Sequence, residues 1–143
     1  MTKIKIDKQV VEEKIKLIEM HLQRLKKMRD LSSGQFALPD NFAIAAYNLR
    51  GALQATFNIC AHILARIPGV RAIEYKEMAI EMGKQKIVPM DFAENQLYKM
   101  AGYRNRLTHF YFEITPKEMY EILQHNLGGF ETFLKHIKRV VEN

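Results

Sequence analysis

Apolar residues recur every three or four positions along most of the chain, which is the spacing of an amphipathic α-helix. From about Lys8 to Arg29 they form one stripe opposite a charged face, and the stripe consists of Val11, Ile15, Ile18, Leu22 and Leu25. A second stretch, from about Pro39 to Ala65, has a broader apolar face rich in alanine, which lets a neighbouring helix approach closely. No segment sustains the period of two that marks a strand, so the sequence predicts an all-α protein.

Three further helices are expected. One fits Tyr75 to Met82 with Gly83 as its C-cap, and another starts near Pro89 and continues to His109. The last starts at Thr115, which is predicted to form a capping box with Glu118. It continues to Val141, with an interruption at Gly128-Gly129 that predicts a kink or a close packing point. The segment Leu31 to Gly34 is expected to be a loop.

The length of 143 residues fits one domain. The prediction is a single-domain antiparallel bundle of about five helices over residues 1–143, with roughly the first seven residues flexible. The longest uninterrupted apolar run, Phe42 to Tyr47, is far shorter than a membrane span needs. No signal peptide is visible at the N-terminus. We therefore expect no membrane association.

The net charge and the cysteine content indicate which partners and which cellular compartment to expect. Lys and Arg number 22 and Asp and Glu 16, for a net charge of +6, which favours a polyanionic partner such as RNA, a nucleotide or an acidic protein. Cys60 is the single cysteine and has no partner for an internal disulfide, so we expect a reducing, cytoplasmic location.

The stretch from Ala101 to Tyr111 contains several polar side chains that can bind phosphate or transfer protons. An arginine such as Arg104 grips phosphate with paired donors, and a histidine such as His109 shuttles protons near neutral pH. Asn105 lies four residues before His109, so both are on one helix face, where the amide can fix the imidazole or bind substrate. Arg104 lies ~140° round the helix from His109. The two can meet only through the long arginine side chain, a helix distortion or pairing across a dimer. From the residues alone, a polar helix end with one hydrogen-bonded histidine remains an alternative.

The other histidines are weaker candidates. His21, His125 and His136 are expected to be surface or half-buried helix residues. His125 and His136 are eleven residues apart, ~16 Å on one helix, so they cannot share a metal ion. No metal site is expected. His62 and Arg66 form an i,i+4 pair that could line a cleft or have a structural role.

The run Arg104-Asn105-x-Leu107-x-His109-x-Tyr111 is an R-x4-H-x-Y motif, and it resembles the HepT-like family of the HEPN superfamily. Further segments from about residue 8 to 140 resemble other parts of that family. They are Tyr47 to Ile63, Tyr75 to Ala79 with Lys86 to Pro89, Leu97 to Asn105, Tyr120 to Leu123 and Phe130 to Leu134.

The resemblance implies a helical homodimer whose two motifs face a shared cleft, acting as a toxin neutralised by a nucleotidyltransferase antitoxin of the MNT type. It makes Arg104 and His109 the nuclease pair, with Asn105 in support. Tyr111 matches the tyrosine to which that antitoxin attaches AMP. Thr108 and Phe110 depart from the residues usual at their positions, and Phe110 could alter the rim of the cleft.

The expected activity is metal-independent, cofactor-free cleavage of RNA, with DNA spared because it lacks the 2′-OH nucleophile. Lys84 and Lys86 either guide RNA or belong to a solvated loop. The main alternative is a non-catalytic nucleotide- or substrate-binding subunit of a two-component nucleotidyltransferase. A third reading is a plain helical dimer with a degenerate site.

Overall fold

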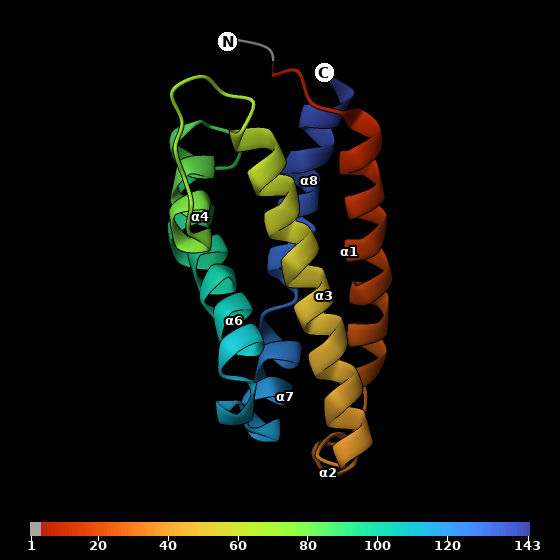
Figure 1. The fold of residues 1–143 in the computed structure, drawn as a ribbon. Coiled ribbons are helices and arrows are strands. Elements are labelled where there is room, and N and C mark those ends of the chain that lie inside the picture. The colour runs from red at the N-terminus through yellow and green to blue at the C-terminus, as the bar shows by residue number, and fades with distance from the viewer. Residues whose placement is uncertain (1–3) are drawn as a thin grey trace.

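The computed structural model describes residues 4–143, and all regular structure in that range is helical. The elements are α1 (Lys8–Arg29), α2 (Ser33–Phe36), α3 (Pro39–Leu64), α4 (Tyr75–Lys84), α5 (Met90–Phe92), the π-helical turn η1 (Ala93–Leu97), α6 (Tyr98–His109), the 3-10 turn η2 (Tyr111–Glu113), α7 (Pro116–His125) and α8 (Gly128–Glu142). Figure 1 shows α1 and α3 side by side in opposite directions, with α4, α6 and α8 completing an elongated bundle. The all-α bundle predicted from the sequence is confirmed.

The first two long helices begin and end where the apolar pattern indicated, because local signals reinforce it. Asp7 caps α1 by accepting a hydrogen bond from the backbone N–H of Val10. Basic side chains occupy the last turn of α1, where their positive charge interacts favourably with the negative end of the helix dipole. Pro39 begins α3 at a position where its missing N–H costs nothing.

The predicted loop at Leu31 to Gly34 is partly wrong, because Ser33–Phe36 forms the short helix α2. The hydroxyl of Ser32 accepts a hydrogen bond from the backbone N–H of Gln35, and the side-chain oxygen of Gln35 accepts one from the backbone N–H of Ser32. Phe36 is fully buried and packs its ring 5.2 Å from that of Tyr120 on α7. Burial of the Phe36 ring therefore stabilises a helical turn in a polar segment that was predicted to be a loop.

Gly83 does not cap α4, which continues to Lys84. Gly83 is buried instead, and a Cβ there would come within 2.8 Å of the Cβ of Ala93. The residue that takes a left-handed conformation after this helix is Lys86, with φ of 59°. Gly83 therefore serves close packing of α4 against the segment that leads into α6.

The predicted C-terminal helix is two helices, α7 and α8, with α7 ending at His125. Gly129 is buried where a Cβ would lie 3.2 Å from the sulfur of Met100, so the expected close packing point is present. Thr115 caps α7 as predicted. Glu118 makes no return bond to the cap and pairs with an arginine of α6, described below, so only half of the capping box forms.

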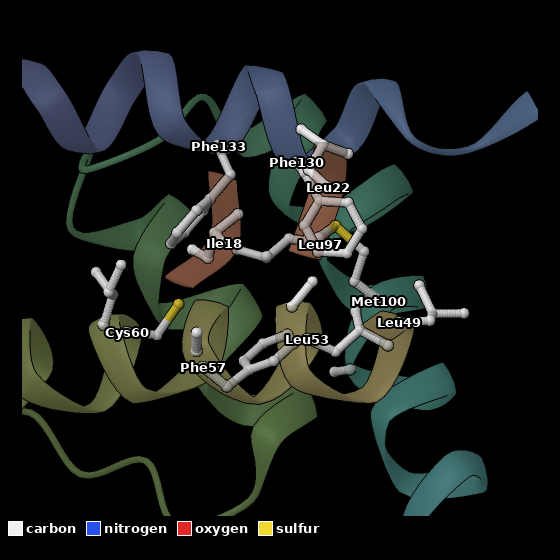
Figure 2. Packing of buried hydrophobic residues seen from close by; sticks show 14 of the residues in the cluster. Ile18, Leu22, Leu49, Leu53, Phe57, Cys60, Leu97, Met100, Phe130 and Phe133 are labelled. Atoms are coloured by element: carbon white, nitrogen blue, oxygen red, sulfur yellow. The ribbon is translucent and has the colours of Figure 1, made fainter. Parts of the chain in front are cut away.

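One hydrophobic core runs through the bundle (Figure 2). Side chains of α1, α3, α6 and α8 meet there, among them Leu22, Phe57, Met100 and Phe133. Cys60 lies in this core, and burial raises the pKa of its thiol. Ile4 and Ile6 pack partly buried against the same core. The flexibility expected of residues 1–3 lies outside the described residues.

No helix within residues 4–143 is long and apolar enough to span a bilayer.

His62 joins the start of α1 to the end of α3. Its Nε2 accepts a hydrogen bond of 3.0 Å from the backbone N–H of Asp7, and its own carbonyl accepts one from Arg66. These contacts favour the structural role over the cleft-lining one. Burial, with the positive charge of Arg66 as the second cause, lowers the pKa of His62 below its ordinary 6.5.

We expect the free energy of unfolding to fall as the pH is lowered through about 6.5. The folded chain holds His62 neutral, whereas the unfolded chain takes up a proton, so stability is present above 6.5 and lost toward the lower folded pKa. Urea unfolding of His62→Gln between pH 7.5 and 5 should show a shallower loss than wild type. An identical slope in wild type and His62→Gln would contradict the assignment.

Candidate functional site

The motif is carried by α6, which follows a π-helical turn at Ala93–Leu97. A π turn holds one more residue than an α turn, so it rotates everything after it about the helix axis. The sequence pattern gave no sign of this turn. It lies before Arg104, and α6 itself is regular from Tyr98 to His109. A helix distortion between Arg104 and His109 is therefore not what relates them.

The guanidinium of Arg104 is held from three sides. Its Nε donates 3.1 Å to the side-chain oxygen of Gln54 on α3, and its Nη1 donates 3.3 Å to that of Asn105. Its central carbon lies 4.0 Å from the ring centroid of Tyr75, the first residue of α4, which is a cation–π contact. Tyr75 is in turn packed edge-on against the buried ring of Phe57. Three separate helices thus fix the orientation of this one side chain.

Among the residues that the structure describes, 4–143, the guanidinium of Arg104 has further N–H groups that make no hydrogen bond. Arginine has five N–H groups, and Gln54 and Asn105 occupy two of them. Nη1 retains one N–H and Nη2 retains both. One N–H on each of these two nitrogens can donate to two oxygens of the same phosphate. Asn105 therefore supports Arg104 in this structure, rather than bonding the imidazole of His109 as one reading of the sequence suggested.

His109 is the last residue of α6 and is exposed. Its ring contacts that of Phe110 edge-on, with centroids 6.4 Å apart. Five residues separate it from Arg104, which is ~7.5 Å along the helix axis and ~140° around it. Within residues 4–143 no hydrogen bond joins the two side chains. Because Arg104 is turned toward α3 and α4, the two groups do not form a single compact site within one chain.

Tyr111 lies in the 3-10 turn η2, immediately after α6, with 40% of its surface exposed. Its ring stacks on that of Phe42 from α3, with centroids 5.7 Å apart and planes 30° from parallel. It also lines a small cavity of about 150 Å³ between α3 and α6, together with Ala43, Ala46, Tyr47, Arg50 and Leu107. The stacking holds the end of the motif against the start of α3.

A bidentate ion pair fixes the far end of α6 to α7. The two guanidinium nitrogens Nη1 and Nη2 of Arg106 donate to the two carboxylate oxygens of Glu118, the second at 2.9 Å. This hydrogen bonding lowers the pKa of the Glu118 carboxyl. The pair explains why Glu118 does not complete its capping box. It positions η2, because the turn lies between the two helices that the pair joins.

The remaining predicted residues lie elsewhere. Gly83, next to Lys84, packs on Met90 and Ala93, whereas Tyr75 at the other end of α4 packs on Arg104. Lys84 is nine residues after Tyr75, ~13.5 Å along α4 from the end that contacts Arg104, so the structure does not bring Lys84 and Lys86 to the motif.

The histidines His21, His125 and His136 lie outside the motif, each in a different environment. His125 is exposed beside Glu121. His136 is half-buried, and burial lowers its pKa. His21 is more buried than expected, at 6% exposed, and its Nδ1 is 2.9 Å from the side-chain oxygen of Asn48.

Sequence reasoning did not assign roles to Gln54, Tyr75 or Arg50 at the site. The helical spacing of the two residues on α3 was visible, since Arg50 and Gln54 share one face with Tyr47. What the pattern lacked was the pairing of α3 with α6, and no local signal specifies which two helices touch.

Comparisons with solved structures identify the same fold. The chain superimposes on a tri-AMPylated HEPN toxin of Shewanella oneidensis in complex with MNT antitoxin, with a TM-score of 0.80 at 23% identity, over 91% of this chain and 97% of that one. A toxin–antitoxin structure with AMP-PNP gives a TM-score of 0.77 at 22% identity, over 92% of this chain and 98% of that one.

Sequence comparison agrees. The chain is 27% identical over 133 residues to a curated tRNA nuclease HepT of Aphanizomenon flos-aquae (strain 2012/KM1/D3), covering 92% of this chain and 90% of the relative. The family model described as "Ribonuclease HepT-like" matches residues 18–137. That match takes in every helix that contributes to the site, and the chain therefore belongs to the ribonuclease HepT-like family.

Proposed function

We propose that this protein is the toxin of a toxin–antitoxin pair, an endoribonuclease that uses Arg104 and His109 and is switched off by AMP on Tyr111. The observation that carries the proposal is the Arg104 guanidinium, fixed by Gln54, Asn105 and Tyr75 with its phosphate-binding edge free. Family membership and the curated relative named a tRNA nuclease support the choice of RNA as substrate.

The reaction follows from the two side chains. The RNA 2′-OH attacks the adjacent phosphorus, the bond from phosphorus to the 5′-oxygen breaks, and the products are a 2′,3′-cyclic phosphate and a free 5′-OH. His109 removes the 2′-OH proton or protonates the leaving 5′-oxygen. Arg104 stabilises the negative charge that develops on the phosphate oxygens. The nucleophile is part of the substrate, so the mechanism requires no metal ion, and DNA is not cleaved.

A homodimer accounts for the separation of the pair. Arg104 and His109 diverge within one chain, and a second copy facing the first brings the Arg104 of one protomer toward the His109 of the other. Exposed aromatic side chains beside the site support such contact, since Phe110 is 47% and Phe112 83% exposed. Burying such side chains against a second copy would remove apolar surface from water.

Inactivation places charge beside this site. The Tyr111 hydroxyl attacks the α-phosphorus of ATP on an MNT-type nucleotidyltransferase, pyrophosphate leaves, and the phenolic proton is lost. The attached phosphate is negative and bulky, so it repels and blocks RNA. The structural neighbour from Shewanella oneidensis is itself AMPylated and bound to an MNT antitoxin, which supports this assignment.

The test combines both activities in purified protein. Wild type should cleave tRNA in the presence of EDTA, and incubation with ATP and the partner nucleotidyltransferase should add the mass of AMP and abolish cleavage. Tyr111→Phe should cleave RNA yet gain no mass. If wild type leaves RNA intact with and without metal while still accepting AMP, the non-catalytic substrate-subunit reading replaces the nuclease. If wild type gains no mass, the modification is wrong.

Gln54 should matter because it orients Arg104. Removing its oxygen in Gln54→Ala loses a hydrogen bond to a charged group, worth ~1.5–3 kcal/mol, so cleavage should slow by ~10–100-fold. Gln85 is a half-buried glutamine beyond the far end of α4, where its Nε2 donates 3.2 Å to Glu81, which makes Gln85→Ala the matched control with near-normal activity. Single-turnover cleavage and thermal unfolding of each variant separate loss of positioning from loss of fold. Equal rates in wild type and Gln54→Ala would contradict the role.

A further inference from the structure

One face of α3 connects the two halves of the proposed site. Tyr47, Arg50 and Gln54 follow each other at helical spacing, so they lie along one stripe. Gln54 holds Arg104, while Tyr47 and Arg50 line a cavity with Tyr111. Arg50 therefore lies on the stripe between the partner of Arg104 and the residues beside Tyr111.

The cavity is small, and the charged side chain of Arg50 lines it. Its volume is about 150 Å³, formed because Ala43 and Ala46 present only methyl groups at this point of α3, with Leu107 opposite on α6. Pockets that enclose whole drug-sized ligands measure ~300–1,000 Å³, so a complete nucleotide does not fit. A single phosphate group, the size of a few water molecules, does.

Arg50 is the charged group in the wall of the cavity. It is exposed, and within residues 4–143 its guanidinium makes no hydrogen bond or ion pair. The other two arginines of the site are engaged, Arg104 by Gln54 and Asn105 and Arg106 by Glu118. Arg50 thus offers all its donors to a ligand beside Tyr111.

We propose that Arg50 binds the phosphate of AMP attached to Tyr111, and that the exposed ring of Tyr47 stacks with the adenine. The proposal rests on the proposed modification of Tyr111. The phosphodiester formed there carries one negative charge, and a guanidinium pairs with two of its oxygens. Tyr47 is 59% exposed at the rim of the cavity, where a base that cannot enter the cavity has an aromatic surface to stack on. AMP is thereby folded onto α3 and shielded, rather than extended into solvent.

The test uses full-length protein AMPylated on Tyr111 by ATP and the partner nucleotidyltransferase. A non-specific phosphodiesterase is added, and release of AMP is followed by intact mass. Loss of a hydrogen-bonded charge pair predicts release about tenfold faster in Arg50→Ala than in wild type, with Arg50→Lys intermediate because it loses the paired geometry. Arg139→Ala removes an exposed arginine on α8 and should match wild type. The ³¹P resonance of the modified wild type should also differ from that of Arg50→Ala.

Each outcome decides a separate point. Equal release rates and equal ³¹P shifts in modified wild type and Arg50→Ala would overturn the Arg50 subsite and leave the modification of Tyr111 intact. An unmodified wild type would overturn the proposed modification and the subsite with it. If Arg50→Ala leaves the shielding of AMP unchanged but raises the KM for RNA, Arg50 serves the RNA backbone and the proposal is wrong.

Discussion

Replacing His109 by alanine is expected to slow RNA cleavage by ~10²–10⁴-fold, the range typical of losing a general acid or base. The residue suits this test because it ends α6, is exposed, and its side chain makes no hydrogen bond or ion pair within residues 4–143. Its loss should therefore leave thermal unfolding unchanged, so a fall in rate reports chemistry rather than folding. The measurement is single-turnover cleavage of tRNA, with products checked for the 2′,3′-cyclic phosphate.

His125 provides a matched control within the same chain. It too is the last residue of a helix and exposed, and it lies beside Glu121 on its own helix. His125→Ala should cleave RNA as fast as wild type. If His109→Ala does the same, the R-x4-H pair is not the nuclease, whatever activity the protein retains.

Replacing Gly51 by alanine should destabilise the protein by ~2–4 kcal/mol, although alanine is the better helix former by ~1 kcal/mol. A Cβ at Gly51 would lie 2.4 Å from Nε2 of His21, far inside van der Waals contact. The ring cannot move cheaply, because it is buried between α1 and α3 and hydrogen-bonded to Asn48. Expelling it would leave the amide oxygen of Asn48 buried without that partner.

Gly102 offers the comparison. It also lies in a helix, but the nearest atom to a Cβ there is the flexible end of Lys76, at 3.7 Å. Gly102→Ala should therefore be neutral or stabilising by up to ~1 kcal/mol. The measurement is urea unfolding, with His21→Ala added to Gly51→Ala as a suppressor. Strong non-additivity of the two substitutions is expected, because His21→Ala removes the ring with which the added Cβ of Gly51→Ala would clash. A Gly51→Ala protein as stable as wild type would show that α1 and α3 can separate without cost.

The helices were predictable because their signals are local. The cap at Thr115 and the proline at Pro39 each act within one turn, and the structure confirms both. Glycines were harder, since a glycine at the end of a pattern indicates either a cap or a tight contact. Gly83 is the second kind, and only the position of Ala93 reveals it.

Only part of the candidate site was likewise predictable from the sequence. The motif from Arg104 to Tyr111 was visible in the sequence because its residues are contiguous. Its supports were not, since Gln54 lies 50 residues before Arg104 and reaches it only once α3 packs on α6. The same holds for Tyr75, which meets Arg104 from α4.

The sequence by itself determined the all-helical class, the two long helices α1 and α3, and the contiguous motif that carries Arg104 and His109, because helical periodicity and motif spacing are properties of neighbouring residues. Only the tertiary structure decided how those groups are used. The π turn at Ala93–Leu97 set the rotation of α6, and the packing of α3 and α4 turned Arg104 away from His109. The physical reason is that side-chain direction at the site depends on contacts between helices distant in the chain, and no short-range pattern encodes them.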